Sequence, residues 1–256
     1  MESQENQYRW PKAEAVYPDR PGRSYTLKRL RYRLRAFLHR GLIAQFEQFI
    51  NQHPFLVKLL NEHADYSYPL VYRFLDKRFN RKQRFQAICD NLRFLPEKLT
   101  ALSTPIYKTP LSFGVVIPDF EMTLSMTTHQ PMEGYWVLEL WHKPRNELVY
   151  LLTFAKLGES LLISVVQGPN FEGSKEMVKQ LTKTCYGLRP AYLMVETMKA
   201  LTKVLGFNQL LGIPQKYQNK SRFIQSSHYV VDYDAIFAES GGQLKDYWEL
   251  PLEIDR

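Results

Sequence analysis

The chain has 256 residues, 45% of them hydrophobic and 14% aromatic, and it carries a formal net charge of +8. This length and composition indicate a globular protein with a sizeable core and exclude a disordered or collagen-like chain. Eight basic residues and no acidic ones lie between positions 20 and 46, so the other 26 Lys and Arg balance the 26 Asp and Glu. The excess charge is therefore local and indicates one anionic contact. Nucleic acid is the least favoured partner, because no nucleic-acid-binding motif accompanies the charge.

The N-terminus reads Met1-Glu2-Ser3-Gln4 and has no basic, apolar leader. No apolar run in the chain approaches the roughly 18 residues that a spanning helix needs. We therefore expect no secretory signal, no transmembrane segment and a cytoplasmic location.

The first hundred residues read as mostly helical. Residues 1–23 are polar and contain three prolines, which predicts an irregular arm. Over 24–104 the apolar spacing predicts helices at about 26–40, 42–51, 54–63, 70–77 and 81–102, with a loop at 66–69. Pro96 is expected to kink or end the last of these helices.

The first predicted helix is amphipathic and basic. Its apolar stripe consists of Leu27, Leu30, Leu34, Phe37 and Leu38. Its other faces carry the cations Lys28, Arg29, Arg31, Arg33 and Arg35. In one interpretation the cations contact anionic headgroups while the stripe enters the membrane interface. In the simpler interpretation, which we favour, the stripe packs on the protein's own core and the cations are solvated.

After Pro105 the pattern changes to strands. Met122, Leu124 and Met126 alternate with polar residues, and further strands are predicted over 135–142, 148–156 and 161–167, joined by short turns. Helices over 174–186 and 190–206 then lead to a buried strand at 207–213. The sequence therefore predicts an α+β protein, in which a helical region is followed over 105–256 by a mixed, mostly antiparallel sheet with flanking helices.

Candidate binding residues gather in this second half. Gln167 and Gly168 end a strand and open a glycine-containing loop, and ligands often bind at strand ends in α/β sheets. Gly187 and Arg189 precede the helix that starts at Pro190, and an arginine beside free backbone N–H groups suits a phosphate or carboxylate. The alternatives are an ordinary turn after Gln167 and an Arg189 that pairs with Asp232, Asp234 or Glu239.

No other motif specifies a chemistry. The His, Cys, Asp and Glu residues have no metal-ligand spacing, and neither a nucleophile elbow nor a phosphate-binding loop occurs. We expect no metal and no cofactor, and whether the protein is an enzyme stays open. The acidic and aromatic run from Asp232 to Pro251 contains carboxylates suited to acid–base chemistry, but we favour a helix, a Gly-Gly turn and a closing strand.

Several short motifs occur together between about residues 105 and 252. They are Gln167-Gly168-Pro169, Lys183-Thr184, Gly187-Leu188-Arg189-Pro190, Gly212, Asp232-Tyr233-Asp234, Glu239, Gly241-Gly242 and Leu250-Pro251. In this order and combination the chain resembles the VirK/YbjX family of bacterial proteins, whose molecular activity is unknown. The resemblance implies a role in the envelope and in virulence, including surface protein display and resistance to antimicrobial peptides. It adds Lys183, Tyr233, Asp234 and Glu239 to the candidate ligand-binding residues. The implied partner is an anionic membrane surface or an envelope protein, at the inner face of the inner membrane.

The order of elements has a weaker similarity to the GNAT-like acetyltransferase fold. This similarity implies an acyl- or aminoacyl-transferase with a CoA-like or carrier-bound donor, held at the loop after Gln167 or at 187–190. The usual Gln-x-x-Gly-x-Gly pattern is not matched, because Gly168 follows Gln167 directly. The sequence thus leaves two hypotheses, a non-catalytic envelope factor and an acyltransferase.

Overall fold

The N-terminal half is helical in the computed structural model, which describes residues 7–127, 130–169, 171, 173–219 and 232–253. Its helices are α1 (Ala13–Val16), α2 (Thr26–Leu38), α3 (Arg40–Asn51), α4 (Pro54–Glu62), the 3-10 helix η1 (Ala64–Val71) and α5 (Arg81–Lys98). Asn80 and Gln83 form a reciprocal capping box that fixes the start of α5. Pro54 takes the first position of α4, where its missing N–H costs nothing.

The second half forms one mixed sheet. Five strands make an antiparallel meander: β1 (Leu111–Ile117), β2 (Phe120–Met126), β3 (Trp136–His142), β4 (Glu147–Leu157) and β5 (Ser160–Gln167). Helices α6 (Ser174–Thr184) and α7 (Pro190–Val204) then cross to β6 (Leu210–Gly212), which pairs parallel to β5. After α8 (Tyr233–Glu239), β7 (Gln243–Leu244) and β8 (Trp248–Leu250) complete the order β1-β2-β3-β4-β5-β6-β8-β7. Short 3-10 turns lie at Pro131–Glu133 (η2), Lys143–Arg145 (η3) and Gln215–Tyr217 (η4). This arrangement confirms the predicted α+β class.

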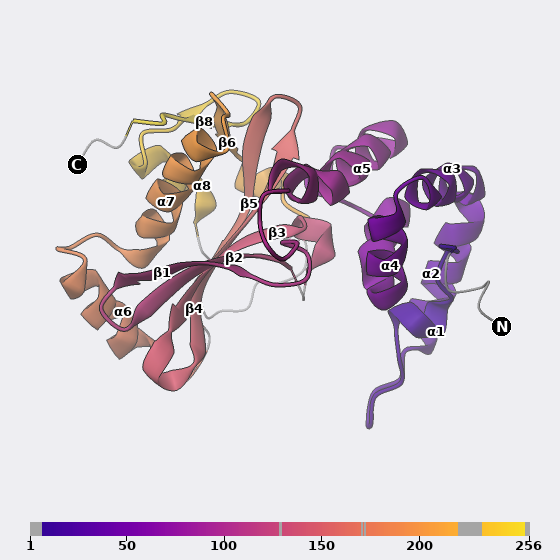
Figure 1. Cartoon of the computed structure of the whole chain (residues 1–256), viewed down its shortest axis with the longest axis horizontal. Coiled ribbons are helices and arrows are strands. Elements are labelled where there is room, and N and C mark those ends of the chain that lie inside the picture. Colours follow the sequence, from indigo (N-terminus) through magenta and orange to yellow (C-terminus); the bar gives the residue numbers. More distant parts are fainter. Residues whose placement is uncertain (1–6, 128–129, 170, 172, 220–231, 254–256) are drawn as a thin grey trace.

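The helices lie on opposite sides of the sheet. Figure 1 shows α1–α4 grouped at one end of the molecule and α6–α8 at the other, with the sheet between them. Helix α7 packs on β4 and β5, and α5 also packs on β4. Among the described residues, none of the helices combines the length and apolar character that a membrane crossing requires.

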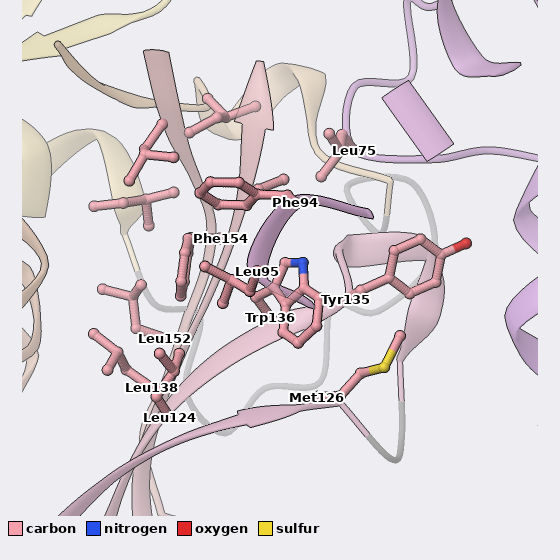
Figure 2. Close-up of a cluster of buried hydrophobic side chains, with 14 of the residues drawn as sticks. Leu75, Phe94, Leu95, Leu124, Met126, Tyr135, Trp136, Leu138, Leu152 and Phe154 are labelled. Carbon is pink, nitrogen blue, oxygen red and sulfur yellow. The ribbon is translucent and has the colours of Figure 1, made fainter. Parts of the chain in front are cut away.

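One hydrophobic core joins the two halves. Figure 2 shows Leu124, Leu138 and Leu152 of neighbouring strands at one end of a buried cluster that extends to Leu95 and Phe94 of α5. The indole of Trp136 donates a hydrogen bond to the Asn91 carbonyl of α5 at 2.9 Å. The expected arm also joins this core, because it contains α1 and its Tyr8 side chain is fully buried, with its hydroxyl 2.7 Å from Ser67 Oγ.

The predicted helix over 70–77 is wrong. Helix η1 occupies the segment where we expected a loop, and the chain from Tyr72 to Asn80 is irregular. Leu75 has φ of 55°, in the left-handed region that a right-handed helix excludes, and Asp76 forms an isolated β-bridge with Gln218. Contacts with a distant segment therefore override the local helical pattern. Helix α5 also continues past Pro96 and ends at Lys98, short of the expected Leu102.

Candidate functional site

Helix α2 exposes its apolar stripe. Each of the five large side chains of the stripe is between 56% and 68% exposed: Leu27, Leu30, Leu34, Phe37 and Leu38. At about 100° per residue, these positions fall within an arc of roughly 100° on the helix surface. The favoured prediction that this stripe packs on the protein's own core is therefore wrong.

The opposite face of α2 explains this orientation. Tyr32 is the buried residue of the helix, at 2% exposed, and its hydroxyl donates to the Pro11 carbonyl at 2.7 Å. Its ring stacks on Trp10 of the N-terminal segment, with the ring centroids 6.0 Å apart. Because one large aromatic side chain anchors the helix, the leucines are left facing solvent.

Two of the five predicted cations, Arg29 and Arg35, each contact two groups of the fold. Arg29 donates to the Tyr17 carbonyl at 2.6 Å and pairs with Asp19 at 2.7 Å. Arg35 donates to the Tyr68 hydroxyl at 2.6 Å, and its guanidinium also lies 3.9 Å from the centre of a neighbouring tyrosine ring. These two arginines hold α2 against the molecule and are not free to reach an external anion.

Of the other three cations, two border the exposed face. At 100° per residue, Arg31 lies beside one edge of the stripe and Arg33 lies beside the other. Arg31 is exposed and has neither an ion pair nor a hydrogen bond among the described residues, whereas Arg33 pairs with Glu14. Lys28 is exposed and lies over the Tyr25 ring at 5.2 Å. The result is an apolar stripe bordered by cations.

A second feature is an open cavity of about 550 Å³ between α6, the start of α7 and α8. Of the predicted ligand-binding residues, Arg189 and Glu239 line it. The hydroxyl of Tyr192 donates to Glu239 Oε2, and the Arg189 guanidinium lies 5.7 Å from the centre of the same tyrosine ring. We did not predict Tyr192, although it follows Arg189 by three residues, a spacing that places both on one helix face.

Two other predicted residues have internal roles. Asp234 Oδ1 accepts hydrogen bonds from the Gln215 backbone N–H at 3.1 Å and from the Trp248 indole at 2.8 Å. The side chain of Tyr233 hydrogen-bonds the backbone of Val166, and burial together with the nearby Glu133 raises the pKa of this tyrosine to about 12. Both residues therefore hold the C-terminal segment against the sheet and η4.

The remaining candidates lie apart from one another. Gln167 is exposed at the end of β5, and a Cβ on Gly168 would lie 3.2 Å from the Tyr150 ring, so this glycine permits close packing. Lys183 and Gly187 are exposed near the end of α6, and Gly187 has φ of 93°. Within the described part of the chain, no His, Cys, Asp and Glu residues are grouped as a metal site requires.

The chain matches one protein family along most of its length. The family is described as "Protein of unknown function (DUF535)", and the match covers residues 21–256. An uncharacterized protein of Haemophilus influenzae is 78% identical over 249 residues, which cover 97% of this chain and 85% of that protein. A protein of Mannheimia haemolytica named "Membrane protein LapB" is 64% identical over 216 residues, 84% of this chain and 96% of that protein.

The predicted relationship to YbjX is confirmed. The uncharacterized protein YbjX of Escherichia coli (strain K12) is 23% identical over 257 residues, 93% of this chain and 77% of that protein. No solved structure matches the chain significantly. The chain therefore belongs to the DUF535 family, as the motifs of its C-terminal half suggested.

Proposed function

We propose that this protein binds the anionic surface of a bacterial membrane through α2 and acts there as a peripheral envelope protein, at the inner face of the inner membrane. The observation that carries the proposal is the exposed stripe of α2 with cations along its borders. The partner is an anionic bilayer, because its charged headgroups match the cations and its acyl chains match the apolar stripe.

The physical argument combines two contributions. Large apolar side chains gain free energy when they leave water for the acyl boundary, and an in-plane helix buries such a face by roughly 5–10 Å. Each Lys or Arg near an anionic surface adds about 1 kcal/mol, and this part is screened by salt. Stable anchoring generally needs both contributions, and α2 carries both.

The Mannheimia relative adds support from outside the structure. It is named a membrane protein, and it aligns with 84% of this chain. A surface helix accounts for membrane association without a spanning segment. We therefore propose that this chain also associates with a membrane, and that α2 makes the contact.

Vesicle flotation tests the proposal. We expect the protein to float with vesicles that contain phosphatidylglycerol, not with pure phosphatidylcholine, and to dissociate as NaCl rises from about 0.1 M to about 0.5 M. The double variant Lys28→Gln/Arg31→Gln should bind more weakly. Its matched control is Arg145→Gln/Lys175→Gln, which removes two exposed cations outside α2. Equal binding to neutral and anionic vesicles, or equal binding by the two double variants, would contradict the proposal.

A second candidate function is acyl transfer with a CoA-like or carrier-bound donor. The observation that favours it is the opening of the sheet between β5 and β6. The parallel pairing ends where the Ile213 N–H donates to the Ile163 carbonyl at 3.0 Å, while β5 continues to Gln167. Gln218 and Tyr233 contact β5 beyond that point. The meander, the crossover helices and the closing strands also follow the order of the acetyltransferase resemblance.

Calorimetric titration separates this candidate from the first. We expect acetyl-CoA or an acyl carrier protein to bind with an affinity that falls when the tyrosine at the opening is changed, as in Tyr233→Ala. The milder Tyr233→Phe controls for folding, because it keeps the ring that fills this space. If none of the acyl-CoA, acyl carrier protein and charged tRNA samples binds, acyl transfer is excluded and the membrane proposal is unaffected.

A further inference from the structure

The cavity between α6, α7 and α8 has an apolar floor. Pro190, Tyr192 and Ile236 line it and are buried, and the half-buried side chains of Val178 and Ala235 extend the apolar surface. Its volume of about 550 Å³ lies within the range of roughly 300–1,000 Å³ that small-molecule sites occupy. The floor therefore suits a ligand with an apolar body.

The rim of the cavity is charged, and the acids on it already have protein donors. Asp232 Oδ1 accepts the Ala235 backbone N–H at 2.9 Å as the N-cap of α8. Glu239 accepts the hydroxyl of Tyr192. Both carboxylates thus serve the fold, and their charge is partly compensated by these donors.

The cations of the rim are differently placed. Arg189 is exposed and forms no ion pair among the residues that the structure describes. Lys179 has only a loose pair with Glu176 at 3.6 Å, in which both side chains are more than three-quarters exposed. Exposed pairs of this kind contribute little and exchange readily. A guanidinium that pairs with no carboxylate of the described segments therefore lies beside an apolar cavity.

The geometry points to a binding site for an anionic amphiphile with one apolar chain. The chain lies on the apolar floor, and the phosphate or carboxylate head pairs with Arg189, whose planar fork can hold two oxygens. The same chemistry is offered by a lysophospholipid or fatty acid and by an acyl donor, which combines an apolar acyl chain with phosphate groups. This site goes beyond the membrane contact, because it is built from other helices and needs no bilayer.

Titration calorimetry with three probes tests this inference. The probes are lysophosphatidic acid, palmitate and decanoyl-CoA, each below its critical micelle concentration, and dodecanol within its solubility serves as an uncharged control. The protein carries Leu30→Ser/Leu34→Ser, so that the stripe of α2 cannot take up the probes. We expect one anionic class to bind with one-to-one stoichiometry and the alcohol to bind at least tenfold more weakly.

Two pairs of variants locate the binding. Arg189→Gln should weaken it about tenfold, whereas Arg145→Gln should leave it unchanged. Ala235→Leu should abolish binding by filling the floor, whereas Ala238→Leu on the exposed side of α8 should not. Binding of lysophosphatidic acid or palmitate identifies a lipid ligand, and binding of decanoyl-CoA alone identifies an acyl donor. If no probe binds at concentrations up to its critical micelle concentration, or if Arg189→Gln and Ala235→Leu both bind as the parent does, the inference is overturned.

Discussion

Truncation of two leucines in α2 gives a quantitative prediction. Leu30 and Leu34 are 59% and 58% exposed, so somewhat more than half of each side chain is available for burial in a membrane. Full burial of a leucine is worth about 1.5–3 kcal/mol, so the exposed part of each side chain contributes about 1–2 kcal/mol. Alanine keeps the Cβ, so Leu30→Ala/Leu34→Ala should remove about 2 kcal/mol, which is roughly a 30-fold loss of vesicle partitioning.

The assay is a titration of the protein with anionic vesicles at fixed ionic strength, read as the fraction bound after flotation. The control is Val204→Ala, which truncates an apolar side chain that is 81% exposed at the end of α7. Because Leu30 and Leu34 make few internal contacts, the thermal midpoint of the double variant should equal that of the parent. If the double variant partitions like the parent, or if the control loses as much, the stripe does not contact the membrane and the reasoning is refuted.

Four further predictions concern stability. Arg35→Gln should lower the free energy of unfolding by about 1–2 kcal/mol, because it removes contacts with two tyrosines. Arg31→Gln should leave the free energy of unfolding unchanged. Equal urea midpoints for the two variants would contradict a structural role for Arg35 and a solvent-exposed one for Arg31. Gly212→Ala should destabilise by about 1–3 kcal/mol, because the new Cβ would lie 2.7 Å from the ring of an α8 phenylalanine. Gly41→Ala, whose Cβ meets open space in α3, should raise the free energy of unfolding by about 0.5–1 kcal/mol. Urea unfolding measures both glycine variants, and a stabilised Gly212→Ala or a destabilised Gly41→Ala would contradict the prediction. Burial lowers the pKa of His39, so its contribution to stability is present above about pH 6.5 and is lost as the pH falls through the folded-state pKa. His39→Gln should therefore reduce the fall in melting temperature between pH 7 and pH 5, and an undiminished fall would count against this cause.

The sequence predicted α2 correctly as an amphipathic helix but not the direction in which it faces. The spacing of the leucines reports that they share a face, and it carries no information about what that face meets. Tyr32 decides the orientation, because its ring fits among aromatic residues far away in the sequence. A single buried tyrosine among arginines is not a recognisable local signal.

The strands also show that a local pattern predicts buried elements better than elements that depend on distant contacts. Strands β2 to β5 alternate or run apolar between clear turns, and their prediction succeeded. Strand β1 was missed, because it is an edge strand with residues exposed on both faces and a glycine at its centre. The irregular segment around Leu75 was missed because its conformation depends on pairing with residue 218.

Only part of the candidate site could be predicted from the sequence. The sequence brought Arg189 and Glu239 into one set of candidates, and both line the same cavity. It also offered Glu239 as an ion-pair partner of Arg189, whereas the structure pairs this carboxylate with Tyr192. Such pairings depend on how α7 and α8 pack together, which no motif in the chain specifies.

The depth of α2 at a bilayer tests the central claim most directly. A cysteine placed by Leu34→Cys and labelled with an environment-sensitive fluorophore reports the polarity around the stripe. The background is Cys185→Ser, because Cys185 is a partly exposed free thiol that would also be labelled. The control label is at Val204→Cys, on an apolar position of another helix that is 81% exposed, against 58% for Leu34. We predict that anionic vesicles shift the emission of the Leu34 label to the blue, that salt reverses the shift, and that the Val204 label does not respond. An unshifted Leu34 label on vesicles that bind the protein would contradict membrane docking through α2.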